Sequence, residues 1–357
     1  PHAHLDKARS WSATGAGYGD LLDAVNWWRE YAAGMDGGDV YSRARRTVGD
    51  YLASGFTAVR THVDLLLAGG DPLRGVDALL TLRDEVAGVL DMQVCVLVSP
   101  LSGTDVVEEA VARGIDVLGG CPHLADDPAA ETTRLLDIAE RHGLPVDLHT
   151  DEQLDPDVLS IIELAEQVRA RAMGQLVTAS HCVSLGMLDA APLARVIDHV
   201  LAADLGIVTL PITNLYLQGR AHPTATPRGL TAIRALLDAG VRVAAGGDNI
   251  RDPFNPMGRA DPFETTSLLI TAGHLDSEAA LALVTDGGRS VLGLPAAGPR
   301  VGARADLVAV EADDITDALA GPTGSRLVLR AGRVVSETTV SRVSALDAAL
   351  VAAGRQP

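Results

Sequence analysis

Histidine and aspartate residues that could hold a metal ion recur in this sequence at the ends of short apolar runs. His2 and His4 flank a single residue, and His149, His181 and Asp248 each close a run rich in apolar residues. Side chains of a strand alternate between faces with a period of two, so one ion can take both His2 and His4. Three imidazoles and a carboxylate leave a position open for water, and such a site suits zinc or iron(II). An ion of this kind lowers the pKa of its water enough to supply hydroxide near neutral pH, so the residues predict a hydrolytic metal centre.

An acid that could move protons lies beside these candidates. Glu152 follows His149 by three residues, in the segment HTDEQ. Displacing an amine requires a proton for the leaving nitrogen while the attacking water loses one, and a carboxylate can carry it. A turn leaving the strand would aim Glu152 back at the ion, so we predict that it is the proton shuttle. His181 could either bind the ion or orient the hydroxide through a hydrogen bond, and we favour the second role.

The elements that must position these residues alternate between short β-rich runs and longer amphipathic stretches. This is the pattern of parallel strands joined by crossover helices. Eight strands are expected, at residues 1–4, 57–64, 92–98, 116–121, 146–149, 176–181, 207–212 and 241–248. Helices are expected at residues 42–53, 76–87, 105–113, 130–142, 156–172, 191–202 and 230–238. The predicted fold class is α/β, a (β/α)8 TIM-like barrel, in which functional groups gather at the carboxyl ends of the strands.

Two units are expected along the chain. Residues 1–297 would form the hydrolase barrel. Residues 298–357 contain the β-like segments VGARADLVAV and RLVLRAGRVV, which predict the C-terminal part of a small accessory β-sandwich followed by a tail. The sequence starts without Met and its first residues already belong to the expected metal site. We therefore expect the other half of the sandwich to lie in a segment before Pro1.

Composition excludes some partners. The 357 residues carry a formal net charge of −18, which argues against binding nucleic acid or an anionic membrane surface. No apolar run approaches the roughly 20 residues that a membrane span needs. Cys95, Cys121 and Cys182 are odd in number and lie in apolar runs, so we expect reduced thiols and a cytoplasmic location. The expected partner is a small molecule.

A family resemblance adds to this interpretation. The chain resembles the cytosine deaminase-like branch of the amidohydrolase superfamily, which includes N-isopropylammelide amidohydrolase-like enzymes, through the ordered motifs PHAHLDK, VRTHVD, HTDEQ, VTASHC, NLYLQGR, GGDNIRDPFNPMG and ADLV. The resemblance implies four ligands for one divalent metal ion, Zn or Fe(II): His2, His4, His149 and Asp248. It implies that Glu152, His181 and Asp248 act in catalysis. It also implies a homo-oligomer that deaminates a small amino-substituted N-heterocycle.

Lysine content bears on the number of ions. Lys7 is the only lysine in the chain. Two-metal members of this superfamily commonly bridge their ions with a carbamylated lysine from a middle strand, and no lysine is present there. A single ion is therefore expected. Lys7 itself would either contact the substrate or pair with an acid.

Five further residues are candidate substrate contacts. His62 and His123 lie near strand ends, with packing as the alternative, and Phe254 matches a family position that stacks on the substrate ring. Leu101 and Asn249 stand where cytosine deaminases carry Gln and Asp. Leucine cannot bond to an amide edge, and an unpaired edge costs about 1–3 kcal/mol, so we expect a pyrimidine, triazine or related ring that is more apolar or N-alkylated than cytosine. The alternatives are hydrolysis of a cyclic amide or release of an alkylamine on the same scaffold, and, in another class, an inactive metal-binding scaffold.

Overall fold

A parallel sheet of seven strands forms the centre of the molecule in the computed structural model, which describes residues 1–322, 324–344 and 346. The strands follow one another in chain order, and each neighbouring pair is parallel. They are β1 (Ala58–Asp64), β2 (Asp91–Val98), β3 (Val117–Gly120), β4 (Val146–Thr150), β5 (Val177–His181), β6 (Gly206–Thr209) and β7 (Arg242–Ala245). The sheet is curled, and its carboxyl ends gather the candidate residues.

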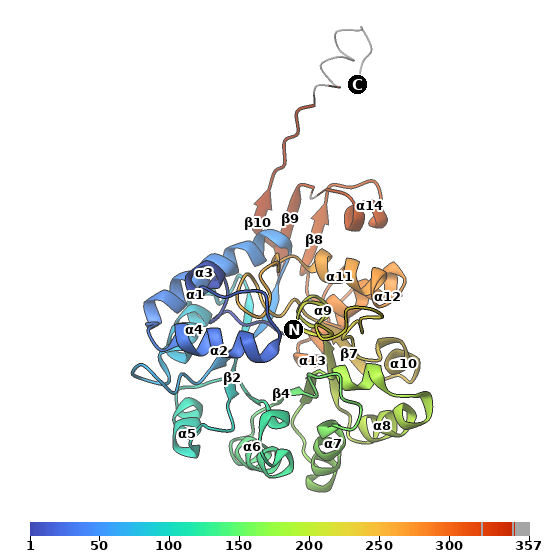
Figure 1. Ribbon diagram of the computed structural model, residues 1–357. Helices are drawn as coiled ribbons and strands as arrows, with labels where there is room; N and C mark the ends of the chain where they lie inside the picture. Colours follow the sequence, from blue (N-terminus) through green and yellow to red (C-terminus); the bar gives the residue numbers. More distant parts are fainter. Residues whose placement is uncertain (323, 345, 347–357) are drawn as a thin grey trace.

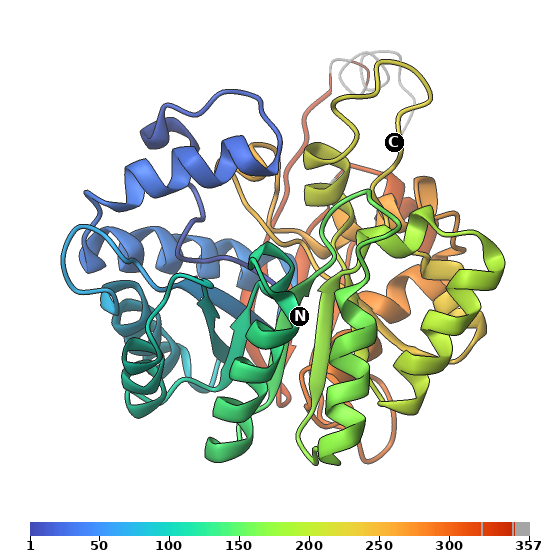
Figure 2. The same ribbon diagram turned by 60° about the horizontal axis from the view of Figure 1, so that its bottom comes forward.

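Helices surround this sheet. Figure 1 shows them as a ring around the strands, with the N-terminus near the centre. Those before β4 are α1 (Trp11–Thr14), α2 (Leu21–Ala32), α3 (Gly37–Ser54), α4 (Arg74–Val86), α5 (Thr104–Ala112), the 3-10 helix η1 (Pro122–Leu124) and α6 (Pro128–His142). Those after β4 are α7 (Ser160–Arg171), η2 (Val183–Met187), α8 (Ala190–Ala202), α9 (Pro211–Leu217), α10 (Ile233–Asp238), α11 (Pro262–Thr271), α12 (Ser277–Val284) and α13 (Asp286–Val291). In Figure 2, α1, α2 and the segment after α9 lie at the same end of the strands.

The hydrophobic core lies between the sheet and these helices. Helix α4, for example, buries Leu79 and Leu82, which belong to the same core cluster as Val94 and Val96 of β2. Apolar positions three or four residues apart give a helix one apolar face, and burying that face against the sheet holds the strand ends in register.

The first expected strand is reduced to a single paired residue. Ala3 forms parallel bridges to Thr61 of β1 and to Asp248 beyond β7. The His62 amide donates to the Ala3 carbonyl at 2.7 Å, and the Asp248 amide donates to the His2 carbonyl at 3.1 Å. A turn over residues 5–9 follows at once, so residues 1–4 cannot extend a ladder. The segment nevertheless lies between the first and last strands of the sheet.

Two other strands end earlier than expected. The strand expected at 207–212 stops at Thr209, because Pro211 opens α9, where proline suits the first turn. The strand expected at 241–248 stops at Ala245, before Gly246. A β-carbon at Gly246 would lie 3.1 Å from the His2 carbonyl oxygen, so the absence of a side chain lets the two segments approach.

The C-terminal part forms a three-stranded antiparallel sheet. Its order is β10 (Arg333–Thr338), β9 (Arg326–Arg330) and β8 (Leu307–Val310), and α14 (Ile315–Ala320) lies between β8 and β9 in sequence. Among the described residues this part of the expected β-sandwich is a single small sheet. The sandwich itself, whose other half is expected before Pro1, stays a prediction. Residues 345 and 347–357 of the expected tail lie outside the described residues.

Two composition-based expectations can be compared with the described residues. Cys95, Cys121 and Cys182 are free thiols, as predicted. Within the described part of the chain, no helix has the length and apolarity to cross a membrane.

Candidate active site

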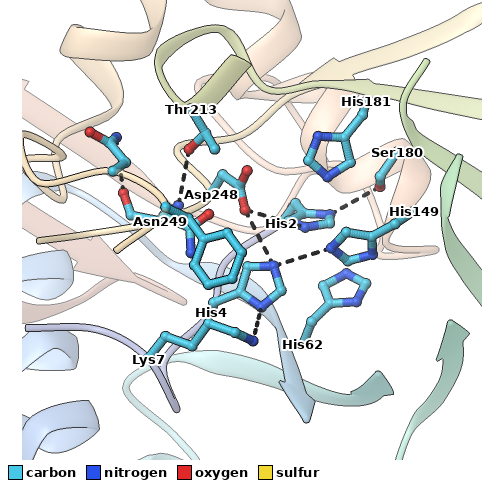
Figure 3. A network of polar contacts seen from close by, with 12 residues as sticks. His2, His4, Lys7, His62, His149, Ser180, His181, Thr213, Asp248 and Asn249 are labelled. Carbon is cyan, nitrogen blue, oxygen red and sulfur yellow. Dashed lines mark hydrogen bonds and ion pairs between the residues drawn. The ribbon is translucent and has the colours of Figure 1, made fainter. Parts of the chain in front are cut away.

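Four of the predicted metal ligands converge at the carboxyl ends of the strands. His4 Nε2 lies 3.2 Å from His149 Nε2 and 3.3 Å from Asp248 Oδ1, and His2 Nε2 lies 3.5 Å from the same oxygen (Figure 3). His2, His149 and His181 also present nitrogens within 4.8 Å of one another. Residues from both ends of the sheet and from its middle therefore surround one point.

The polar atoms facing this point fit a cation. His2 Nε2, His181 Nε2 and both carboxylate oxygens of Asp248 are buried and have no hydrogen-bond partner among the residues that the structure describes. Leaving such groups unpaired in a protein interior is costly, and a cation would satisfy the imidazole lone pairs and the carboxylate together. Three imidazoles and one aspartate also form a donor set that zinc and iron(II) accept.

Electrostatics at the site point the same way. Burial, followed by the nearby charge of Asp252, raises the pKa of Asp248 to about 8. Burial and the neighbouring imidazoles lower the pKa of His2 and His149 well below the usual value, so these rings are neutral. A neutral imidazole keeps a lone pair for a metal, and a divalent charge would favour the ionised form of Asp248.

The predicted proton carriers lie beside the metal candidates. Glu152 Oε1 is 3.2 Å from His181 Nδ1, and the Asn214 amide nitrogen lies 3.2 Å from the same nitrogen. Burial, and then the charge of Asp248, raises the pKa of Glu152 well above its usual value. His181 is the last residue of β5, and Asp248 lies three residues after the end of β7. Both adopt left-handed backbone angles, with φ of 72° and 55°. Such conformations are uncommon for residues other than glycine, and they turn both side chains toward the cluster.

A buried chain of hydrogen bonds below the cluster fixes the tautomer of His2. Ser180 Oγ donates to Asp147 Oδ1 at 2.7 Å and lies 3.0 Å from His2 Nδ1. Although burial raises the pKa of Asp147, His62 and Arg60 lower it to about 2, so this carboxylate is ionised and only accepts. Because the Ser180 hydrogen points to Asp147, His2 Nδ1 must donate to Ser180. The lone pair of His2 is then on Nε2, which faces the other candidate ligands.

Replacing Ser180 with alanine is expected to lower the affinity for zinc about 10- to 100-fold, the usual effect of removing an outer partner of a ligating histidine. The measurement is competition for zinc with a chromophoric chelator. Ser180→Thr, which keeps the hydroxyl, should recover part of the affinity. Ser184→Ala removes a neighbouring serine hydroxyl that bonds only to the loop at Gln153, and it should leave the affinity unchanged. Equal affinity in Ser180→Ala and the unmodified protein would disprove the tautomer assignment.

A cavity of about 880 Å³ opens onto the cluster and separates the predicted substrate contacts into two groups. Lys7, Leu101, Asn249 and Phe254 line it, together with His4, His149, Glu152, His181 and Asp248. His62 and His123 are absent from its lining. His62 is fully buried and stacks on His2 with ring centroids 4.0 Å apart, while His123 Nδ1 contacts the His149 carbonyl at 2.9 Å. The structure therefore does not bring these two histidines to the cavity.

The position of His62 has a simple reason. Strand β1 continues to Asp64, so His62 lies two residues before the strand end, on the face that points into the sheet's concave side. It consequently lies below the ligand cluster, where it approaches Asp147 Oδ2 at 3.5 Å.

Comparison with known proteins identifies the family. The family model described as "Amidohydrolase family" matches residues 2–336, nearly the whole chain. The chain belongs to the amidohydrolase family.

Relatives of this amidohydrolase include several deaminases. It is 35% identical to a pterin deaminase from Rhizobium rhizogenes, over 94% of this chain and 79% of the relative. A crystal structure of 5-methylcytosine deaminase from Klebsiella pneumoniae with 5-fluorocytosine is similar, with a TM-score of 0.86, 29% identity, and coverage of 96% of this chain and 86% of the other. N-isopropylammelide isopropylaminohydrolase from Burkholderia multivorans has a TM-score of 0.78 and 30% identity, with coverage of 94% and 84%. These similarities are consistent with the resemblance expected from the motifs.

Lys7 of this amidohydrolase is held in a buried ion-pair network. Its Nζ lies 2.8 Å from Asp64 Oδ1, 3.4 Å from Asp6 Oδ2 and 3.2 Å from His4 Nδ1. The Trp28 indole donates to Asp64 Oδ2 at 2.7 Å, which ties α2 to the same carboxylate. Burial by itself would lower the pKa of Lys7, but the charges of Asp6 and Asp64 outweigh it, and the net effect raises the pKa above its usual value. The side chain therefore stays charged. Lys7 therefore pairs with acids, one of the two alternatives expected for it, and it also lines the cavity. Its contact with the substrate stays a prediction.

Replacing Lys7 with methionine is expected to destabilise the amidohydrolase by about 3–5 kcal/mol, because it leaves buried carboxylates without their counter-charge. Chemical denaturation followed by circular dichroism measures this change. Arg45→Met, which removes an exposed ion pair with Glu85, serves as the control and should change the stability little. An equally small effect of Lys7→Met would show that the network contributes nothing to folding.

Three residues that support the site were not predicted from the sequence: Arg60, Asp147 and Ser180. Arg60 Nη1 donates to Asp147 Oδ2 at 2.8 Å, and both side chains are fully buried. The available signal was a charge inside an apolar strand. Arg60 precedes His62 by two residues and Asp147 precedes His149 by two, so both share the face of a candidate functional residue. Ser180 gave no comparable signal, since a serine next to a histidine has many structural roles.

Proposed function

We propose that this amidohydrolase holds one divalent cation, zinc or iron(II), on His2, His4, His149 and Asp248 and hydrolytically deaminates a small amino-substituted N-heterocycle. One observation carries the proposal. Nε2 of His2, His4 and His149 and Oδ1 of Asp248 converge at the cavity, and the buried acid Glu152 lines the same cavity. Family membership and deaminase relatives support a hydrolase that cleaves carbon–nitrogen bonds.

The residues have distinct parts in this reaction. The cation, when bound, supplies Lewis-acid chemistry that makes water nucleophilic near neutral pH. Glu152 takes a proton from the attacking water and delivers it to the leaving nitrogen, and its raised pKa allows it to hold that proton. His181, held by Asn214, orients the water through a hydrogen bond. The carbon–nitrogen bond breaks and ammonia leaves, and the remaining proton of the new hydroxyl moves to the adjacent ring nitrogen, so that the carbon–oxygen bond becomes a carbonyl.

The substrate we favour is a ring larger or more substituted than cytosine. The relatives are described as acting on a pterin, on 5-methylcytosine and on N-isopropylammelide, so pteridine, pyrimidine and triazine rings are the candidates. A cavity of about 880 Å³ accommodates a substituted or two-ring heterocycle. Leu101 lines it and offers no hydrogen bond, which argues against a ring recognised through an amide edge at that position. Phe254 also lines the cavity and could stack on the ring.

Release of an alkylamine is the second candidate reaction. It uses the same residues and differs only in the leaving group, and the N-isopropylammelide relative favours it. Opening of a cyclic amide has no observation of its own in its favour.

Two inferences about the architecture accompany the proposal. We infer that the sheet closes into an eight-membered (β/α)8 barrel through the bridges of Ala3. Residues 1–297 would then be the catalytic unit, and the small sheet from residue 298 onward an accessory unit. Homo-oligomerisation and a cytoplasmic location stay predictions.

The test is ammonia or alkylamine release across matched aminopteridines, aminopyrimidines and aminotriazines, with protein loaded with zinc or iron(II). We expect turnover of at least one ring, with ammonia released in equal amount to the oxo product. Stoichiometric metal binding without turnover of any ring would instead favour the inactive metal-binding scaffold.

A further inference from the structure

The outer part of the active-site cavity has an apolar wall. Leu67, Leu101 and Leu124 line the cavity and come after β1, β2 and β3 in sequence. Their side chains remain 49%, 73% and 48% exposed. Leu21 and Val25 of α2 line the same cavity.

These leucines are not explained by packing in the core. Leu65 and Leu66, which precede Leu67, are buried in the hydrophobic core, whereas none of the three exposed leucines belongs to that core cluster. Isolated exposed leucines are ordinary on a protein surface, but a group of them from three separate loops around one cavity is typical of a ligand-binding surface.

Charges near the wall disfavour an anionic ligand. Arg134 lines the cavity, but its Nε and Nη2 donate to the Glu131 carboxylate at 2.7 and 2.6 Å, and its Nη1 donates to the Ser102 carbonyl at 3.3 Å. Asp126 and Asp127, which follow Leu124 in the chain, also line the cavity. Lys7 is paired with Asp6 and Asp64, and Arg29 of α2 is the third base in the lining. Acids therefore outnumber bases among the lining residues. A neutral apolar group fits this surface better than a carboxylate.

We propose that the substrate carries a neutral, apolar substituent on the side of its ring remote from the leaving amino group, and that Leu67, Leu101 and Leu124 bind this substituent. The inference rests on the proposed deamination. The leucines and the residues His4, His149 and Glu152 line one continuous cavity, so a ring with its amino group at the ligand cluster extends toward this wall.

The test compares matched rings that differ only in the remote substituent. In the pteridine series, the rings are pterin, 6-methylpterin, 6-propylpterin and 6-carboxypterin. An equivalent series can be built on aminopyrimidines. Equilibrium binding to zinc-loaded Glu152→Gln protein gives the affinity without turnover, and the unmodified zinc-loaded enzyme gives kcat/KM. Each buried methylene should improve affinity about threefold to fourfold. The carboxylated ring should bind more weakly than the methylated one.

Substitutions identify the wall. Leu67→Asn and Leu124→Asn should each reduce the ratio of propyl to unsubstituted affinity at least fivefold, while the affinity for the unsubstituted ring changes little. Leu22→Asn is the matched control, because Leu22 is 65% exposed on α2 and does not line the cavity. It should leave the ratio unchanged.

The results separate the two proposals. Equal or weaker binding of the alkylated rings, tighter binding of the carboxylated ring, or equal effects of Leu22→Asn and Leu124→Asn would each overturn the apolar-wall inference. Absence of ammonia release from every ring, combined with preferential binding of the alkylated ones, would overturn the proposed deamination and leave the wall assignment supported.

Discussion

Replacing Glu152 with glutamine is expected to lower kcat about 10²- to 10⁴-fold while metal content stays the same, since general acid–base catalysis contributes factors of this size. Glutamine has nearly the same shape and can keep a contact with His181 Nδ1, which lies 3.2 Å from Glu152 Oε1. It cannot accept a proton from water and return it to a leaving nitrogen. The loss should therefore appear in kcat more than in the affinity for the ring.

The measurement combines steady-state ammonia release with metal analysis of the same preparation. Glu166→Gln is the control, because Glu166 is an exposed acid on α7 that faces His199 rather than the cavity. It should have normal turnover. Unchanged kcat in Glu152→Gln would mean that another group moves the proton.

Replacing Asp248 with asparagine is expected to abolish stoichiometric metal binding and, with it, turnover. The loss of metal affinity should exceed the roughly 10- to 100-fold that outer partners of a ligand contribute, because Asp248 supplies the negative charge of the cluster. Its Oδ1 lies within 3.5 Å of both His2 Nε2 and His4 Nε2. Burial already disfavours the ionised carboxylate, so the neutral asparagine should not unfold the protein.

Metal per chain after dialysis, measured by mass spectrometry of the elements, and the thermal unfolding midpoint test this prediction together. The variant should be folded and contain little metal. Glu264→Gln provides a control at a partly buried acid on α11, outside the cluster and its cavity. One retained ion per Asp248→Asn chain would exclude Asp248 as a required ligand.

Much of the site could be predicted from the sequence because it follows from strand periodicity. The His-x-His pattern at His2 and His4 required one shared face, and His149 and His181 lie within or at the ends of β4 and β5, as their apolar runs indicated. Because the carboxyl ends of parallel strands lie at one edge of the sheet, residues far apart in the sequence could be predicted to lie together. Glu152 followed because the chain leaves β4 after Thr150, only two residues before this acid.

Other features depended on backbone details that periodicity does not contain. The first segment pairs only through Ala3, because a turn begins at once, so strand content at residues 1–4 was overestimated. The sequence predicts His62 as a substrate contact because it lies near the end of its strand. In the structure it lies two residues before that end and is buried, with its ring stacked on His2.

The loop after β7 illustrates a third limit. Asn249 lines the cavity, but its side-chain Nδ2 donates to Asp252 Oδ2 at 2.9 Å. The backbone N–H of Phe254 donates to Asp252 Oδ1 at 2.9 Å. Asp252 thus holds both candidate substrate contacts in place. Local loop bonds of this kind depend on the path of the chain in three dimensions, which residue spacing alone does not specify.

The most direct test of the central claim is a crystal structure of the zinc- or iron-loaded protein, with data collected on both sides of the metal absorption edge. We predict one anomalous peak per chain, about 2.0–2.2 Å from nitrogens of His2, His4 and His149 and from an oxygen of Asp248. An ion bound elsewhere, or two ions sharing these residues, would contradict a mononuclear centre at this position.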